Sequence, residues 1–294
     1  MAKLAIEGCL TAIVTPFKDG KIDFDTLAKL VDWQIEQGVD GIVAVGTTGE
    51  SATLNVEEHV AVIAAAVKAA KGRVPVVAGA GGNATTEALE LTKASEDAGA
   101  DALLHVTPYY NRPSQEGLFR HFEAVAKSTK LPIVLYNVPS RTACDLLTET
   151  VVRLCEYDNI VAIKDATGNL VRGGELIAKV GHKMNVLSGD DGTSFPLYAL
   201  GAKGVISVVS NIAPKQMSDM WDAVKAGDWE RAKKRHYELR VLNAMLFFEP
   251  SPAPTKAALA LMNRCSAEAR LPIVEATKAL VDQLRVELKT AGLL

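Results

Sequence analysis

A lysine lies at the end of an apolar run in the segment IVAIKDATGN, residues 160–169. Burying an unpaired ammonium group is costly, so such a lysine is paired with an acid, lies at a water-filled edge, or is kept because its neutral amine is useful. The adjacent Asp165 could pair with Lys164 and give it a structural role. Alternatively, the apolar neighbours Val161 and Ile163 would desolvate the amine and leave part of it neutral and nucleophilic.

Polar groups of complementary chemistry follow other apolar runs of the chain. They lie in the segments GTTGES (46–51), TPYYNRPS (107–114), YNVPSRT (136–142), SGDDG (188–192) and ISVVSN (206–211). Each segment has a simple structural explanation, such as a helix-capping threonine, a packing tyrosine or a solvated arginine. Together, the hydroxyl groups, an arginine and an amine indicate a catalytic site in which a lysine forms a Schiff base with a ketone.

The role of each group in such a site follows from its chemistry. A protonated imine withdraws electrons, so loss of a proton gives an enamine, which is a carbon nucleophile. A tyrosine hydroxyl can carry protons into and out of these steps. The threonine hydroxyls and backbone N–H groups of the GTTG turn suit the carboxylate of a 2-oxo acid, and Arg141 suits a second carboxylate through bidentate contact.

Eight short apolar runs alternate with longer amphipathic stretches, at a spacing of about thirty residues that is typical of βαβ units. The runs begin at Leu10, Gly41, Val74, Asp101, Leu131, Asn159, Met184 and Lys203. Helical stretches include residues 25–38 and 56–72, each ended by a glycine, and residues 84–99. Eight such units predict an α/β fold, the closed (β/α)8 TIM barrel, which places its chemistry at the carboxyl ends of the strands.

The rest of the chain is predicted to be helical and exceeds the single helix that closes a barrel. We therefore expect a barrel over residues 1–227 that carries the active site. A helical C-terminal region over residues 228–294 is expected to pack on the barrel or on a neighbouring subunit.

Composition argues against several other classes of protein. The 294 residues carry a net charge of −3 with both signs mixed along the chain, which argues against a nucleic-acid partner. Without a membrane-spanning apolar stretch or a recognisable signal peptide, a soluble cytoplasmic protein is expected. The four cysteines and five histidines are dispersed, so neither a disulfide framework nor a metal site is predicted. His59, with Glu57 and Glu58 beside it, is expected on a helix surface.

The segments GTTGESATL, TPYYNRPSQEG, YNVPSRT, IKDATGN and SGDD resemble the dihydrodipicolinate synthase family, and the resemblance covers essentially the whole chain. This family belongs to the class I aldolase and N-acetylneuraminate lyase superfamily. The resemblance implies a lyase of the diaminopimelate route of lysine biosynthesis. Such an enzyme condenses pyruvate with L-aspartate 4-semialdehyde to give 4-hydroxy-tetrahydrodipicolinate, with no metal or organic cofactor.

The resemblance also implies which residues are catalytic. Lys164 would form the Schiff base, Tyr136 would donate and accept protons beside it, and Thr47 and Tyr110 would complete a proton relay. In the family the second tyrosine reaches across a subunit interface into the neighbour's site. A dimer would then be the smallest complete unit, and a homotetramer built as a dimer of dimers is the expected assembly.

Substrate binding is implied in the same way. Thr48 would hold the pyruvate carboxylate and Arg141 the carboxylate of the semialdehyde, while the backbones of Gly189 and Ile206 would line the pocket. Relatives on the same fold that cleave sialic acids or deoxy sugar acids generally lack this arginine. The intact YNVPSRT segment therefore favours the synthase over those relatives.

Lysine is expected to act as an allosteric feedback inhibitor at the dimer interface. In the family this site is formed by positions that match Ser51, Ala52, His59, Asn83, Glu87 and Tyr109. Val56 departs from the pattern, because lysine-sensitive members often carry a second histidine there. His59 and Glu87 could instead be an exposed pair on helix surfaces.

Three alternatives remain open. Another pyruvate-dependent aldolase or lyase of the same superfamily would act on a sialic acid or a 2-keto-3-deoxy sugar acid. Glycines near the last two strands could build a phosphate site, and the run AGAGGNAT (78–85) weakly resembles a dinucleotide loop. A non-catalytic barrel, kept for interaction or regulation, would leave Lys164 without a chemical role.

Overall fold

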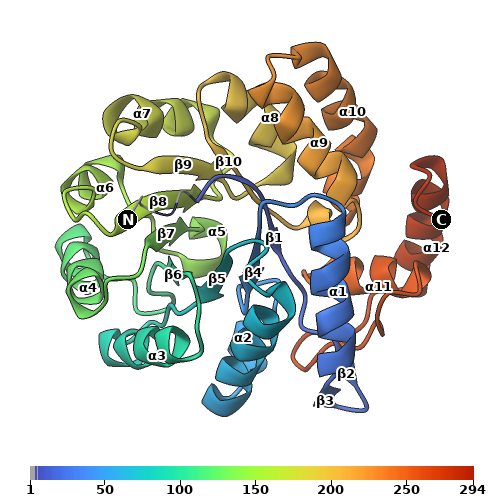
Figure 1. The fold of residues 1–294 in the computed structure, drawn as a ribbon, viewed down its shortest axis with the longest axis horizontal. Coiled ribbons are helices and arrows are strands. Elements are labelled where there is room, and N and C mark those ends of the chain that lie inside the picture. Colours follow the sequence, from blue (N-terminus) through green and yellow to red (C-terminus); the bar gives the residue numbers. More distant parts are fainter. Residues whose placement is uncertain (1–3, 5) are drawn as a thin grey trace.

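Eight parallel strands close into a barrel in this computed structural model, which describes residue 4 and residues 6–294 (Figure 1). The strands are β1 (Gly8–Ala12), β4 (Gly41–Ala44), β5 (Val76–Gly79), β6 (Ala102–Val106), β7 (Ile133–Asn137), β8 (Ile160–Asp165), β9 (Asn185–Ser188) and β10 (Gly204–Ser207). Consecutive barrel strands are neighbours, and β10 returns to pair with β1 in the register Gly8 to Gly204. All eight predicted runs form barrel strands, so the predicted (β/α)8 fold is confirmed.

Helices surround the barrel as an outer layer (Figure 1). They are α1 (Phe24–Glu36), α2 (Val56–Ala70), α3 (Thr85–Asp97), α4 (Gln115–Ser128), α6 (Thr148–Leu154), α7 (Leu170–Val180), α8 (Asp191–Ala199) and α9 (Pro214–Lys225). The short helix α5 (Pro139–Thr142) is not part of this layer and lies in the loop after β7. After α1, Gly38 takes a φ of 90°, as expected for a glycine that ends a helix. After α2 the first left-handed residue is Lys71, and Gly72 follows it. The lysine therefore shares with Gly72 the role of ending the helix, which had been predicted for the glycine.

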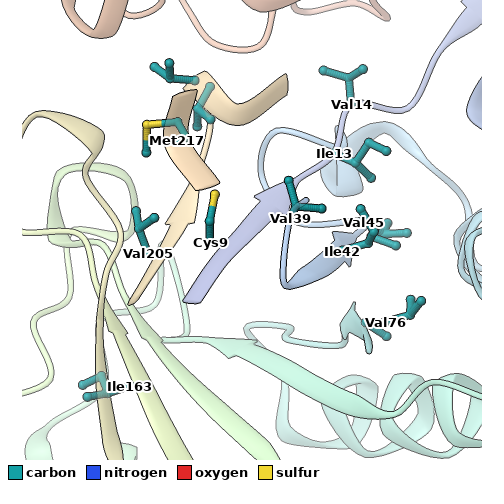
Figure 2. Packing of buried hydrophobic residues seen from close by; sticks show 14 of the residues in the cluster. Cys9, Ile13, Val14, Val39, Ile42, Val45, Val76, Ile163, Val205 and Met217 are labelled. Atoms are coloured by element: carbon teal, nitrogen blue, oxygen red, sulfur yellow. The ribbon is translucent and has the colours of Figure 1, made fainter. Parts of the chain in front are cut away.

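Apolar side chains fill two separate spaces, one inside the barrel and one between the barrel and its helices. Along β7, Val134 and Tyr136 belong to the inner cluster, whereas Ile133 and Leu135 belong to the outer one. This division follows from the alternation of side chains along a strand. Figure 2 shows part of the outer cluster, in which residues of strands meet residues such as Met217 of α9.

The C-terminal region adds three helices, α10 (Trp229–Met245), α11 (Ala253–Leu261) and α12 (Lys278–Thr290). Helix α10 packs against α8 and α9, and α12 packs against α10 and α11. A short hairpin of β2 (Phe17–Lys18) and β3 (Lys21–Ile22), which was not predicted, lies before α1. Within the described part of the chain, every helix is too short or too polar to cross a membrane.

Two histidines are buried where β6, α3 and α4 meet. His105 lies 3.3 Å from the hydroxyl of Thr92, and His121 lies 3.0 Å from the hydroxyl of Thr85. Burial, with a smaller contribution from His121, lowers the pKa of His105 to about 3, and burial lowers the pKa of His121 to about 4. Both imidazoles are therefore neutral in the folded chain near neutral pH.

Acid is expected to destabilise the fold through these two side chains. Below the ordinary histidine pKa of 6.5 the unfolded chain takes up protons that the folded chain does not, so stability falls as the pH falls toward 4. The loss approaches about 1.4 kcal/mol per pH unit for each imidazole. Denaturant unfolding between about pH 7 and pH 5 should show a shallower dependence for His105→Gln than for the wild type. The exposed His182→Gln is the control, and an unchanged slope in His105→Gln would contradict the expectation.

Candidate active site

A polar cavity of about 380 Å³ lies at the carboxyl ends of the barrel strands. Its walls come from the loops after β4, β7, β8, β9 and β10 and from the segment between α10 and α11. The lining residues are Thr47, Thr48, Tyr136, Val138, Ser140, Arg141, Lys164, Ala166, Gly189, Asp190, Val208, Phe247 and Ser251. Six residues predicted for the site therefore line one cavity, and the walls combine an amine, several hydroxyl groups and a guanidinium group.

Lys164 and Tyr136 face each other across two neighbouring strands. They are register partners on β8 and β7, and the Lys164 Nζ lies 4.1 Å from the centre of the Tyr136 ring. Both side chains are about 95% buried. An ammonium group on the face of an aromatic ring is attracted by the ring quadrupole. This contact holds the amine beside the ring of the tyrosine that was predicted as its proton partner.

The structural explanation for a lysine at this position was an ion pair with Asp165. Asp165 does not form that pair with Lys164. Its carboxylate instead binds Arg172 of α7, with 2.7 Å between Nε and Oδ2, and accepts a hydrogen bond of 3.0 Å from the backbone of Thr167. Successive residues of a strand point to opposite faces, so Asp165 faces the helices while Lys164 faces the barrel interior. The acid therefore stabilises the outer layer and leaves the amine free.

The surroundings of the amine also differ from the expectation. Ile163 belongs to the outer apolar cluster (Figure 2) and so cannot desolvate Lys164. Gly189, in contrast, matters through its missing side chain, because a Cβ there would lie 3.0 Å from Cε of Lys164 and 2.6 Å from Cβ of Ala166. Glycine at position 189 leaves room for the extended lysine side chain.

The predicted carboxylate-binding groups come from two loops. Thr47 and Thr48 lie in the turn after β4, where Gly49 and Glu50 donate backbone hydrogen bonds to the carbonyls of Gly46 and Thr47. Arg141 lies in the short helix α5 after β7 and is exposed at the cavity wall. A substrate that carries a carboxylate at each end could therefore reach hydroxyl groups at one end and a guanidinium group at the other.

Two predicted residues are not among the residues that line the cavity, and seven lining residues were not predicted. Ile206 is buried in the inner cluster, and the lining residue of that strand end is Val208. Tyr110 is 90% exposed, has a left-handed φ of 74°, and is not among the residues that line the cavity of its own chain. Five of the unpredicted lining residues lie in strand-end segments that had been noted, namely Val138, Ser140, Ala166, Asp190 and Val208. Phe247 and Ser251 come from the C-terminal region, and local sequence gives no sign that they reach the cavity.

The six positions proposed for lysine binding lie close to one another beside the cavity. Ser51, Ala52 and Tyr109 line a second cavity of about 300 Å³, which shares Thr47 and Arg141 with the first. The Asn83 side chain donates a hydrogen bond of 3.2 Å to the Tyr109 carbonyl. Glu87 of α3 lies close enough for its charge to act on both His59 and Tyr109.

His59 was predicted to lie on a helix surface, and this prediction is wrong. It is buried on the inner side of α2, and its Nε2–H donates a hydrogen bond of 2.6 Å to the Gly79 carbonyl at the end of β5. Desolvation lowers its pKa, and the hydrogen bond and Glu87 partly oppose this effect. Hydropathy patterning placed His59 outside because histidine is polar, but its hydrogen bond to the sheet requires the opposite face.

The glycine run AGAGGNAT does not need a dinucleotide to explain it. A Cβ at Gly79 would lie 2.2 Å from the Val45 carbonyl oxygen, and one at Gly81 would lie 2.5 Å from the Val106 backbone nitrogen. Glycine is required because neighbouring strand ends approach closely here. Among residues 4 and 6–294, histidine, cysteine, aspartate and glutamate side chains form no group of three that could hold a metal ion.

A closed parallel barrel with a polar cavity at the carboxyl ends of its strands has the architecture of a TIM-barrel enzyme. The model of the dihydrodipicolinate synthetase family matches residues 5–291. The chain is 50% identical over 288 residues to the 4-hydroxy-tetrahydrodipicolinate synthase of Thermodesulfovibrio yellowstonii, covering 98% of this chain and 99% of that protein. The chain therefore belongs to the dihydrodipicolinate synthetase family and is an enzyme, as the sequence resemblance predicted.

Solved structures agree with this assignment. The dihydrodipicolinate synthase of Acinetobacter baumannii, described as chloride-inhibited and complexed with pyruvate, is 50% identical with a TM-score of 0.97, covering 99% of this chain and 100% of that one. A dihydrodipicolinate synthase of Cyanidioschyzon merolae with lysine bound is 39% identical with a TM-score of 0.95 and covers 98% and 99% of the two chains. The shared barrel therefore extends over nearly the whole chain.

Proposed function

We propose that this enzyme condenses pyruvate with L-aspartate 4-semialdehyde to give 4-hydroxy-tetrahydrodipicolinate, the first committed step of lysine biosynthesis by the diaminopimelate route. The observation that carries the proposal is the buried amine of Lys164 facing Tyr136 in a cavity lined by Thr47, Thr48 and Arg141. The names of the curated relatives and the pyruvate complex of the Acinetobacter enzyme support the choice of substrates.

The chemistry proceeds through a Schiff base on Lys164. The neutral amine attacks the ketone carbon of pyruvate, and loss of water from the carbinolamine gives the imine. Removal of a methyl proton gives the enamine, whose carbon attacks the aldehyde of the second substrate and forms the new C–C bond. The amino group of that substrate then attacks the imine carbon, which closes the ring and releases Lys164. Tyr136, with Thr47 and Tyr110, moves the protons of these steps.

Arg141 is proposed to select the second substrate by its carboxylate. In Arg141→Leu the KM for aspartate semialdehyde should rise by about 10- to 100-fold, the effect of losing charge-assisted hydrogen bonds. The KM for pyruvate should stay near the wild-type value, because the pyruvate carboxylate is bound by the Thr47–Thr48 turn. Steady-state kinetics with each substrate varied in turn gives both constants. A rise in the pyruvate KM alone would show that Arg141 binds the carboxylate of pyruvate instead.

The main alternative is a lyase acting on a sugar-derived 2-oxo acid, and a coupled assay separates the two. Purified enzyme is given pyruvate with aspartate semialdehyde in one reaction, and N-acetylneuraminate or 2-keto-3-deoxygluconate in others. Turnover of the first pair alone is the expected result. Cleavage of either sugar acid without turnover of the first pair would overturn the proposed function.

We further propose that the working enzyme is a homotetramer built from dimers, in which Tyr110 enters the neighbouring subunit's site. A non-glycine residue with a φ of 74° and an almost fully exposed aromatic ring is unfavourable in an isolated subunit. Insertion into a partner would bury that ring.

Lysine is proposed as a feedback inhibitor that binds beside His59, Glu87 and Tyr109 at the same interface. The carboxylate of Glu87 suits an ammonium group of the ligand, and the structure of the Cyanidioschyzon relative with lysine bound supports the choice of ligand. Initial rates should fall as lysine is added, and Glu87→Gln should need more lysine for the same inhibition. Rates that stay constant up to saturating lysine would remove this proposal.

A further inference from the structure

A lysine of the C-terminal region is completely buried against the barrel. Lys256 of α11 has no exposed surface, and its Nζ forms an ion pair with Glu50. The same Nζ donates a hydrogen bond of 2.8 Å to the Glu268 carbonyl and lies 4.1 Å from the centre of the Phe17 ring. The ammonium group therefore has a carboxylate, a carbonyl and an aromatic face as partners, which is the kind of environment that a buried charge requires.

Glu50 belongs to the turn that carries the two threonines of the active site. It follows Thr48 by two positions, and its backbone N–H donates a hydrogen bond of 3.1 Å to the Thr47 carbonyl. Its φ of 57° is left-handed, which is uncommon for a residue with a side chain. The conformation of the turn therefore depends on interactions that hold Glu50 in place.

The C-terminal region holds the Glu50 carboxylate from two sides. One oxygen contacts Lys256, and the other accepts a hydrogen bond of 3.0 Å from the Arg270 backbone. The Arg270 side chain in turn binds both carboxylate oxygens of Glu58 at 2.7 Å and the Thr53 carbonyl at 3.1 Å. These contacts attach the segment after the turn to the same part of the C-terminal region.

Stability alone does not account for an ion pair at this place. Two well-packed apolar side chains commonly stabilise a fold as much as a buried ion pair does, or more. An ion pair differs from an apolar contact because its geometry is directional and fixes the groups that it joins. Here the group that it fixes is a residue of the loop that lines the catalytic cavity.

We propose that Lys256 and Glu50 are positioning residues, which hold the Gly46–Glu50 turn so that Thr47 and Thr48 face the substrate. The inference rests on the proposed function, in which Thr48 binds the pyruvate carboxylate and Thr47 takes part in the proton relay. The C-terminal region then acts on catalysis through this ion pair as well as through the lining residues Phe247 and Ser251.

The test compares Glu50→Gln, Lys256→Met and the double variant with the wild type in the full-length enzyme. The KM for pyruvate should rise by about tenfold or more and kcat should fall, because one misplaced hydrogen-bonding group is worth about that factor. The KM for aspartate semialdehyde should stay near the wild-type value, since Arg141 lies on a different loop. Borohydride labelling with pyruvate counts the competent sites, so a loss of folded enzyme is not mistaken for a fall in kcat.

The double variant keeps the test decisive where a single variant folds poorly. Lys256→Met leaves Glu50 buried without its partner, which is strongly destabilising, whereas the double variant leaves no unpaired charge and should recover thermal stability. Its pyruvate KM should nevertheless remain high. Arg235→Met is the matched control, because it breaks an ion pair with Asp219 that joins α9 and α10 away from the cavity. This control should lose stability without a change in either KM.

Two results separate this inference from the proposed function. If the wild type does not turn over pyruvate with aspartate semialdehyde, the proposed function is wrong. If the wild type is active and the folded double variant has the wild-type pyruvate KM, the function stands and the positioning role of Lys256 and Glu50 is wrong.

Discussion

Replacing Lys164 by alanine is expected to reduce turnover by about 10⁴-fold or more, the scale seen when a covalent nucleophile is removed. Lys164 supplies the amine of the cavity, and Asp165 is occupied by Arg172 on the other face of the strand. The loss should therefore come from the missing covalent step, with little change in the packing of the outer layer. Thermal unfolding of the variant should stay close to that of the wild type.

Borohydride reduction in the presence of pyruvate measures that covalent step directly. The wild type should gain the mass of a reduced pyruvate adduct on the peptide that contains Lys164, and Lys164→Ala should gain none. Lys203→Ala is a suitable control, because this lysine is exposed just before β10. If Lys164→Ala and the wild type were labelled equally, the Schiff base would lie on another residue. If neither were labelled, no Schiff base would form.

Replacing Tyr136 by phenylalanine is expected to lower kcat by about 10²- to 10⁴-fold, the range of a general acid or base. The aromatic ring that contacts the Lys164 amine at 4.1 Å would remain, so the variant removes the hydroxyl group and keeps the packing. Slow borohydride labelling by pyruvate should persist, because the amine can still attack the ketone. Proton transfer would then limit the reaction.

The rates of labelling and of turnover together test this role. Tyr157→Phe is a matched control, because it removes a tyrosine hydroxyl that donates a hydrogen bond of 2.6 Å to Glu123 on the outer helices. This control should keep the wild-type kcat. A Tyr136→Phe enzyme that also kept it would show that another group, such as Thr47 or water, moves the protons.

Much of the fold could be predicted because each barrel strand can be recognised in the sequence as a separate apolar run. The eight apolar runs have a regular spacing, and burial on both faces makes them apolar throughout. The strand ends also identified the cavity, because closure of a parallel barrel brings all carboxyl ends to one rim. Lys164, Thr47, Thr48 and Arg141 were found in this way, whereas Tyr136 and Gly189 were assigned to the site through the family resemblance.

The parts that were not predicted depend on contacts between different secondary-structure elements. Phe247 and Ser251 reach the cavity only because the C-terminal region folds back over the rim. Burial of His59 follows from one hydrogen bond to the end of β5, and Asp165 has Arg172 as a partner seven residues later on a helix. Pattern and propensity describe neighbours along the chain, so they carry little information about partners of this kind.

The pairing of β1 with β10 has a consequence for how the chain is made. The strand β1 pairs with β4 on one side, but its second partner is available only when the segment around Gly204 has left the ribosome, so the growing chain carries an unpaired strand edge for most of synthesis. The contact of Lys256 with Glu50 forms later still. A nascent or truncated chain that ends before Lys256 contains all eight barrel strands, but it lacks one of the contacts that hold the threonine turn. Full activity should therefore appear only after the last part of the chain has been synthesised and folded.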